Sequence, residues 1–541
     1  MKTGKLLILF TASFAMTTAW SSEREELLKL KNTTLNLIQA LVEEGLLPAE
    51  KARKLIRRAE AKAAEEVKEA AAEAEEEASS RKAIRVTYVP QFVREEIEEK
   101  VREQLRKDVV DDVKVQAREE GWGIPGSLPE WLERISLTAD LRLRGQEDFY
   151  ASGNQANTIL DFNEVNNAGG IIPAGQDAFL DTTQNRKRLR LRARVGLNAQ
   201  VTDNLKVGFR VTTGNIRNPV SLNQTLGNTG RRYEIALDRA FFQYDAKDPA
   251  GFPWLTLMAG RTPNPWLHTD LVWDDDLSFE GVMATGRLAF GESTADHHRP
   301  HAFLTGGFFP LQEEKFSADD KWMVGGQLGV DWPFQKASRV RFGVAYYDYH
   351  NIAGVPNKLG STEQDFTAPQ FVQNGNTMFD IRTDANLQTN LFALASDFNI
   401  INFTAKYDYT GFDPVHLTLT GDYARNIGFD QGEIFRRTGL SLNKNVDAWQ
   451  VRLDVGWPKV EKFGDWKVFF AYKRLEANSV VDAFPDSNFH LGGTNAQGYV
   501  VGGAYGLAKN TWLRVRWYST DAIEGPQYGV DTLQLDLNSK L

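Results

Sequence analysis

The sequence predicts an all-β transmembrane barrel of about 16 antiparallel strands, preceded by an N-terminal α-helical segment. Three observations predict the barrel. Apolar and charged side chains alternate along successive segments, long and short connections alternate between these segments, and tryptophans lie beside the short connections. A soluble β-sandwich explains the first observation but gives no reason for the other two.

The strand expected from residue 187 to 201 shows the alternation most clearly. Every second side chain from Leu189 to Val201 is apolar, and the side chains between them include Arg188, Arg190, Arg192 and Arg194. Successive side chains of a strand point to opposite faces of the sheet. An arginine facing lipid near the midplane costs ~2–4 kcal/mol, so we expect the arginines to face water and the apolar side chains to face lipid. A tight turn at Asp203 and Asn204 makes a hairpin with the next strand.

Composition is consistent with a barrel. The hydrophobic fraction is 42% and the mean hydropathy is −0.40, values that half-apolar strands produce. The absence of cysteine excludes disulfides and thiolate metal sites. The net charge of −9 argues against nucleic acid as a partner.

The first 134 residues differ in character from the rest. Residues 1–21 are expected to be a signal peptide, with Lys2 and Lys5 ahead of an apolar run that ends at Met16. Residues 22–121 are expected to form a periplasmic helical segment or coiled coil, and residues 122–134 a linker. The barrel is expected from 135 to 541.

The third helix of the segment carries apolar residues with a period of four: Val93, Ile97, Val101, Leu105, Val109 and Val113. A shared seam of this period coils right-handedly. The seam has no partner within the segment, which favours self-association and a homotrimer. The Ala/Glu/Lys-rich stretch from Ala59 to Ala78 reads as a solvated spacer or, less readily, as a weak coiled coil.

The expected strands start near residues 135, 187, 205, 232, 254, 279, 301, 322, 338, 391, 415, 446, 465, 498, 511 and 529. Long loops at one end and short turns at the other are typical of outer-membrane barrels, whose short turns are periplasmic. Beside the short turns lie Trp254, Trp332, Trp457, Trp466 and Trp512. Their amphipathic rings suit a membrane interface.

Two strands need separate comment. The strand near Tyr233 changes phase around Asp238 and Arg239, which indicates a bulge or a wrong register. The last strand alternates regularly and ends at Leu541, similar to the signal that the barrel assembly machinery reads, although such signals more often end in an aromatic residue.

Several phrases resemble the putative porin family of Gram-negative outer membranes, which joins an N-terminal helical segment to a barrel. They are VPQFVREEI (Val89 to Ile97), WGIPGSLPEWL (Trp122 to Leu132), GRTPNP (Gly260 to Pro265), VWDDDLSFEG (Val272 to Gly281), GGTNAQGY (Gly492 to Tyr499) and LQLDLNSKL (Leu533 to Leu541). The resemblance implies an outer-membrane barrel of porin type. It supplies neither an agreed substrate nor catalytic residues.

Two groups of charged residues are candidate site residues. The basic side chains expected to line the pore are Arg142, Arg144, Arg188, Arg190, Arg192, Arg194 and Arg210. The acidic side chains of the third long loop are Asp270, Asp274, Asp275, Asp276 and Glu280. This loop either folds inward as a constriction facing the arginines or is an acidic surface loop. A calcium site is a third and weaker reading, because the one-three-five spacing is missing.

No metal site, cofactor or catalytic residue is expected. Near His297, His298 and His301 there is no thiolate and no pair of carboxylates that would complete a metal site. No Ser, His and Asp set has interpretable spacing.

The expected function is passive diffusion of small hydrophilic solutes or ions across the outer membrane, and the protein is not expected to be an enzyme. The first alternative is an envelope tether, whose helices reach peptidoglycan or another partner. The second is a barrel hydrolase. The helical segment distinguishes the channel from the tether, because a tether needs this segment and conduction does not. Turnover of a lipid or ester would identify the hydrolase.

Overall fold

The computed structural model describes residues 134–290, 299–315, 318–334 and 337–541. The chain separates into two units, Met1–Trp122 and Gly123–Leu541, and every described residue belongs to the second unit. Several predictions concern residues outside the described ranges. These are the signal peptide, the helical segment with its apolar seam, the linker up to residue 133, and His297 and His298.

Sixteen long strands form the wall of the barrel in the described part of the chain. They are β1 (Ile135–Tyr150), β2 (Arg186–Gln200), β3 (Leu205–Thr212), β5 (Ala236–Lys247), β6 (Pro253–Thr262), β7 (Phe279–Ala289), β8 (His301–Gln312), β9 (Lys321–Pro333), β10 (Ser338–His350), β13 (Asn399–Phe412), β14 (Val415–Asn426), β15 (Asp447–Gly456), β16 (Trp466–Leu475), β17 (Ala496–Ala508), β18 (Thr511–Ala522) and β19 (Gly529–Lys540). Neighbours in the chain pair antiparallel, and β1 pairs with both β2 and β19. The sheet is therefore closed, and the predicted barrel is confirmed.

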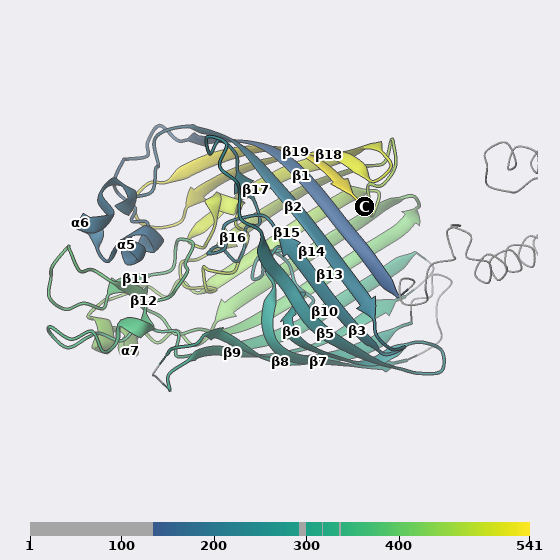
Figure 1. Ribbon diagram of the computed structural model, residues 1–541, viewed down its shortest axis with the longest axis horizontal. Coiled ribbons are helices and arrows are strands. Elements are labelled where there is room, and N and C mark those ends of the chain that lie inside the picture. The colour runs from purple at the N-terminus through teal and green to yellow at the C-terminus, as the bar shows by residue number, and fades with distance from the viewer. Residues whose placement is uncertain (1–133, 291–298, 316–317, 335–336) are drawn as a thin grey trace, which may run out of the picture. The chain divides into compact units, whose positions relative to one another are not determined.

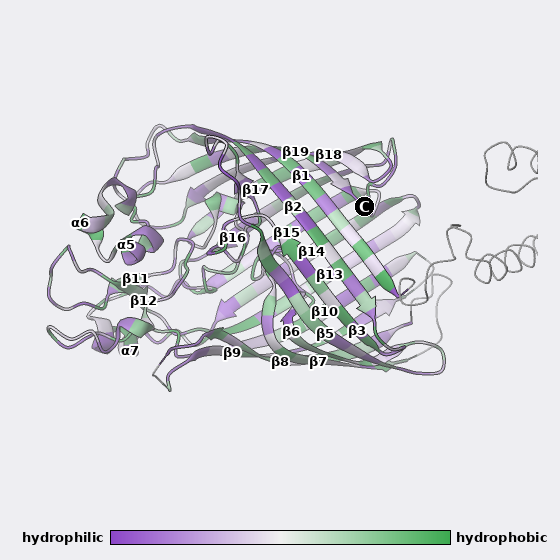
Figure 2. Ribbon diagram, in the orientation of Figure 1, coloured by the Kyte–Doolittle hydropathy of each residue, from purple (hydrophilic) through white to green (hydrophobic). Residues whose placement is uncertain are grey.

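Hydrophilic and hydrophobic residues alternate along the strands of the wall (Figure 2), and the exposure of their side chains alternates with them. In β19, Leu533, Leu535 and Leu537 are 36%, 47% and 44% exposed, whereas the side chains between them, Gln534 and Asp536, are 1% and 0% exposed. A soluble barrel would bury the leucines. Exposed leucines and an enclosed polar face indicate lipid outside and a polar interior.

Long connections gather at one end of the barrel and short turns at the other (Figure 1). The long ones used below are L2 (213–235), L3 (263–278), L5 (351–398) and L7 (476–495). The long connections contain α5 (Phe162–Ala168), α6 (Ile171–Ala174), η1 (Gly175–Ala178), β4 (Gln224–Thr225), η2 (Asp365–Thr367), β11 (Met378–Asp380), β12 (Phe392–Leu394), α7 (Gln431–Thr438) and η3 (Phe489–Leu491). Among the described residues, no helix combines the length and the apolar character needed to cross a membrane.

Two expected strand starts are wrong by several residues. The strand expected near residue 232 begins at Ala236, and the one expected near residue 391 begins at Asn399. In the second case, the residues from 392 to 394 are apolar but form β12, which pairs with β11 inside L5. This short apolar run therefore forms one strand of a hairpin within a loop, and not a strand of the barrel wall.

The phase change near Asp238 is a β-bulge, one of the two predicted explanations. Arg210 pairs with Arg239 and Val211 pairs with Leu237, which leaves Asp238 as the extra residue. The bulge turns the Asp238 carboxylate inward, where it is 3% exposed and accepts hydrogen bonds from Arg210 and Ser278.

The five noted tryptophans all lie at the short-turn end. Trp254, Trp466 and Trp512 are at or next to the first residue of β6, β16 and β18, and Trp332 and Trp457 are at the ends of β9 and β15. Trp254 and Trp332 are 49% and 51% exposed. This arrangement is that of an interfacial aromatic belt.

The junction between the first and the last strand, β1 and β19, contains a buried ion pair. Arg144 on β1 donates two hydrogen bonds to Asp536 on β19, at 2.6 and 3.0 Å. Both side chains are 1% exposed. The Nη1 of Arg144 also donates to Asn488 of L7, at 2.8 Å.

We predict that Arg144→Ala destabilises the barrel by about 3–5 kcal/mol, because it leaves a buried carboxylate without its main partner. The folded band of the variant on electrophoresis should be lost at a lower temperature. Lys187→Ala is the control, since it removes an exposed ion pair with Glu147, of the kind that contributes at most about 1 kcal/mol. Equal effects of the two substitutions would show that the buried ion pair between β1 and β19 does not stabilise the barrel more than an exposed one.

Candidate functional site in the barrel interior

The seven predicted arginines all project from the inner face of β1, β2 and β3. Across the β1 and β2 pair, Arg142 lies opposite Arg192 and Arg144 lies opposite Arg190. Arg142 and Arg144 are buried, and the other five are partly buried. The arginines therefore form one patch on the inner wall, here called the arginine ladder.

Five ladder arginines form ion pairs with carboxylates. Arg144 pairs with Asp536, Arg188 with Asp148, and Arg210 with Asp238. Arg192 and Arg194 share two carboxylates: Asp140, at 3.1 and 2.6 Å, and Asp276, at 2.9 and 3.4 Å. These pairs reduce the repulsion within the ladder.

Arg142 and Arg190 have no carboxylate partner among the described residues. Arg142 donates to Asn223 of L2 at 2.5 Å, and Arg190 donates to Gln146 and Ser221 at 3.4 Å each. All three acceptors are neutral. The ladder on β1 and β2 thus holds an excess of positive charge.

L3 runs along the inside of the wall instead of outward. The backbone of Leu267 exchanges two hydrogen bonds with Gln327 on β9, both 2.8 Å. The carbonyl of His268 accepts from Lys406 on β13, at 2.8 Å, and the Thr269 hydroxyl donates to Asp422 on β14. The strands contacted, β9, β13 and β14, lie successively further along the barrel wall from β6, the strand after which L3 begins.

The acidic part of L3 then reaches the opposite wall. Asp270 pairs with Lys473 on β16 at 2.7 Å, and Asp276 pairs with Arg192 on β2. Six barrel strands separate β7 from β16 on one side, and seven separate β16 from β6 on the other. L3 therefore crosses the interior of the barrel.

An aromatic cluster holds the base of L3. Trp266 packs on Phe309 and Tyr347 with ring centroids 5.8 and 5.3 Å apart, and Trp273 packs on Tyr347 and Phe279 at 5.1 and 4.9 Å. These rings are nearly inaccessible to solvent. Burial of so much aromatic surface stabilises the inward position of the loop.

L7 also enters the interior and binds L3. Asp486 of L7 pairs with Lys473 at 3.1 Å, so this lysine holds one carboxylate from each loop. Asp274 accepts from the backbone N–H of Ser487 at 2.9 Å, and its own N–H donates to the carbonyl of Phe484 at 2.8 Å. The two loops form one hydrogen-bonded unit.

The five acidic candidates have different environments. Asp274 is buried, and burial together with Asp276 and Asp486 raises its pKa well above the usual value. Burial also opposes ionisation of Asp276, but the Arg192 guanidinium and its neighbours outweigh it and lower the pKa of that carboxyl. Asp275 is exposed. Glu280 lies in β7, outside the loop, and pairs with Arg261.

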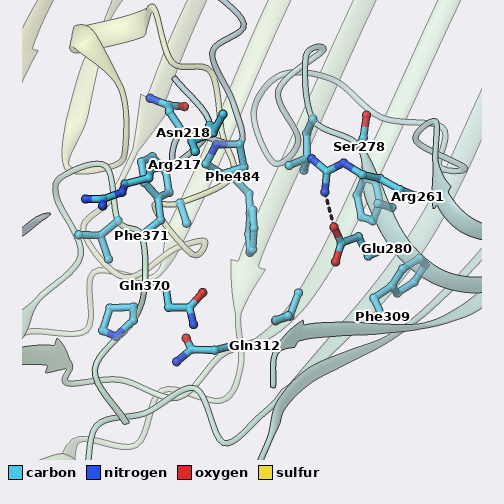
Figure 3. A pocket seen from close by; sticks show the side chains of 18 of the residues that line it. Arg217, Asn218, Arg261, Ser278, Glu280, Phe309, Gln312, Gln370, Phe371 and Phe484 are labelled. Atoms are coloured by element: carbon cyan, nitrogen blue, oxygen red, sulfur yellow. Dashed lines mark hydrogen bonds and ion pairs between the residues drawn. The ribbon is translucent and has the colours of Figure 1, made fainter. Parts of the chain in front are cut away.

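Two cavities lie against L3. One, of about 650 Å³, is lined by Trp273, Leu277 and residues of L2, L5 and L7, and is here called the loop-side cavity (Figure 3). The other, of about 640 Å³, is lined by Asp270, Asp275 and residues near the short turns, and is here called the turn-side cavity. No residue lines both cavities.

Positive charge predominates in both cavities. The turn-side cavity is lined by seven basic side chains, Lys406, Arg452, Lys459, Lys467, Arg514, Arg516 and Lys540, against three acidic ones, Asp270, Asp275 and Glu461. The loop-side cavity is lined by Arg217, Arg261 and Lys321 against Asp238 and Glu280. In each cavity the basic side chains thus outnumber the acidic ones.

Several of these residues escaped sequence reasoning. Lys473, Lys406 and Lys540 were not singled out, although each occupies an inward position of its strand. The alternation alone could have identified them. The contacts of L7 with L3 left no comparable signal, because loop residues follow no periodicity.

A family model described as putative porin matches residues 31–541. The chain belongs to the putative porin family. This porin-type barrel has the architecture that Gram-negative bacteria place in the outer membrane. A comparison with curated protein sequences found no match.

Several solved structures match this chain at low sequence identity. The outer membrane channel DcaP of Acinetobacter baumannii has 10% identity and a TM-score of 0.38, with 76% of this chain and 98% of that chain covered. OprB of Pseudomonas putida has 12% identity and a TM-score of 0.42, with 78% and 97% covered. OmpT of Vibrio cholerae, in its trimer form, has 11% identity and a TM-score of 0.38, with 75% and 99% covered.

L7 also contacts L5 through a buried carboxyl group. Asp482 of L7 is 1% exposed, and one of its oxygens accepts from the backbone N–H of Asn376 of L5 at 3.3 Å. The other oxygen has no hydrogen-bond partner. Burial raises the pKa of Asp482 to about 7.

We predict that the contact between L5 and L7 weakens as the pH rises. A carboxyl whose folded-state pKa is raised contributes stability that is complete below its ordinary pKa and is lost as the pH rises through the folded-state value, here about 7. Hydrogen exchange in L5 and L7, corrected for intrinsic rates, should accelerate across this range. Asp482→Asn should abolish the dependence and Asp384→Asn, in an exposed part of L5, should leave it unchanged. Protection independent of pH in the wild type would refute this.

Proposed function

We propose that the protein is a passive diffusion channel of the outer membrane for small hydrophilic solutes, with a preference for anions. The observation that supports this most directly is the pair of cavities on either side of L3, inside a closed barrel, in each of which basic side chains outnumber acidic ones. A solute crossing the barrel passes from one cavity to the other around L3.

Anion preference follows from the charges that have no partner. Fixed charges of one sign raise the concentration of counter-ions in a confined space, over a screening length of ~8–10 Å at physiological salt. Arg192 and Arg194 share two carboxylates, Asp140 and Asp276, so this group of four side chains is neutral. Selectivity then depends on Arg142 and Arg190 and on the excess of lysines and arginines in the turn-side cavity.

L3 acts as the constriction in this proposal. Its contacts with β9, β13, β14, β16 and β2 support a fixed position within the pore. The acidic side chains neutralise basic groups of the wall and hold the loop, so they narrow the pore without making it cation-selective.

The partners expected from the sequence remain predictions, apart from membrane lipid against the exposed apolar face of the barrel. These are a homotrimer formed with the help of the N-terminal seam, recognition of the last strand by the barrel assembly machinery, and contact with peptidoglycan. Conduction by the barrel requires none of them.

We predict that the double substitution Arg190→Glu and Arg192→Glu shifts the reversal potential toward cations. It changes the charge of the inner wall by four units, and the shift should shrink at high salt because ions screen the wall. Single-channel recording in a planar bilayer under a salt gradient measures both effects.

Lys187→Gln is the control, because Lys187 lies on the outer face of the same strand and its side chain is 78% exposed. It should leave the reversal potential unchanged. An unchanged reversal potential in the arginine double variant, with normal barrel assembly, would show that the ladder lies outside the conduction path. A wild-type protein that assembles but passes no ions would refute the proposed function.

A further inference from the structure

The loop-side cavity differs from the wide aqueous mouth that unselective diffusion requires. Its lining combines aromatic and aliphatic side chains, among them Phe371, Phe484 and Leu311, with a few polar groups. Small-molecule sites have this composition, and the volume of about 650 Å³ is within their usual range. The cavity is therefore large enough to hold an organic solute with an apolar body.

The charge of the solute follows from Lys321. This lysine begins β9, lines the cavity and is 4% exposed. Its ammonium group donates to Gln312 Oε1 at 3.1 Å and to the carbonyl of Ala368 at 2.8 Å. Both acceptors are neutral, and Lys321 has no carboxylate within 4.0 Å among the described residues. Glu314 accepts a hydrogen bond from the Gln312 amide and interacts electrostatically with Lys321, but it forms no ion pair with it. A buried ammonium without a paired carboxylate is costly, so the position favours an anion.

The same corner of the cavity has further donors for a carboxylate. An ammonium group carries three N–H donors, and Lys321 uses two of them. Figure 3 shows the amide groups of Gln312 and Gln370 projecting toward one another. Gln370 is exposed and forms no hydrogen bond through its side chain with another described residue. The free N–H of Lys321 and the Gln370 amide can therefore donate to one carboxylate.

The rings of Phe371 and Phe484 supply the other half of the site. Phe371 follows Gln370 in L5, and Phe484 belongs to L7, the loop bound to L3. The only ion pair between residues that line the cavity, Arg261 with Glu280, is on the opposite side in Figure 3 and is already neutral. Lys321 is near Gln370 and Phe371 in L5, because its ammonium group donates to the carbonyl of Ala368, two residues before Gln370.

We propose that the loop-side cavity binds small organic monocarboxylates with an apolar or aromatic body, with the carboxylate at Lys321 and Gln370 and the body against Phe371 and Phe484. The site selects among solutes before they reach L3. This inference rests on the proposed function, because the cavity can select among solutes only if solutes pass through the barrel.

Calorimetry on the detergent-solubilised full-length protein tests the proposal with hydrocinnamate as the probe. Hydrocinnamamide keeps the ring without the charge, and propionate keeps the charge without the ring. Each should bind at least about tenfold more weakly than hydrocinnamate, because the amide loses the hydrogen bonds between charged groups and propionate loses the burial of the ring. Equal affinity for hydrocinnamate and its amide would overturn the assignment of the charge, and no binding of hydrocinnamate would overturn the site.

Variants then locate the site. Lys321→Gln should lower the affinity for hydrocinnamate at least about tenfold and remove its advantage over the amide. Phe371→Ala should weaken hydrocinnamate binding and leave propionate binding unchanged. Lys187→Gln, on the outer face of β2 and 78% exposed, and Phe463→Ala, 74% exposed near a short turn, are the matched controls and should have no effect. Wild-type affinity in a folded Lys321→Gln barrel would place the site elsewhere.

Conductance of the same wild-type sample separates the two proposals. A barrel that conducts ions but does not bind hydrocinnamate leaves the proposed function intact and refutes the carboxylate site. A barrel that binds hydrocinnamate but passes no ions refutes the channel and leaves the site as a binding pocket.

Discussion

Lipid cannot solvate a guanidinium or a carboxylate, and the organisation of this barrel follows from that constraint. Every charged side chain in the middle of a strand must face the interior, so the sixteen strands bring a large number of charges into one confined space. Carboxylates neutralise many of the basic groups, as Asp536 does for Arg144 at the junction of β1 and β19. Those left over, such as Arg142 and Arg190, give the interior its net charge.

The same charges position the loops. L3 and L7 enter the barrel because the wall offers them partners: Lys473 binds a carboxylate from each loop, and Arg192 binds Asp276. The aromatic cluster around Trp273 adds apolar contact at the base of L3. Ion pairs on one side and packed rings on the other hold L3 across the interior, and the two cavities are the space that the loops leave.

Much of the wall could be predicted from the sequence, because strand periodicity and the solvation of charge both act locally. The inward phase of Arg188 to Arg194 and the bulge at Asp238 are of this kind. The strand start near residue 391 was wrong because an apolar triplet in a loop has the same local pattern as a wall strand. The site was less predictable. Contacts such as that of Asp274 with Ser487 join residues far apart in sequence through backbone groups, which any residue type supplies.

In the proposed channel, L3 lies across the path of permeating ions, and Asp275 lines the turn-side cavity. The chain contains no cysteine, so Asp275→Cys provides a single reactive thiol. A bulky thiol reagent added during single-channel recording should lower the conductance of each pore in one discrete step, because the modified side chain obstructs the passage beside L3. Complete modification of Cys at this position, verified by mass spectrometry, with unchanged conductance would contradict the account.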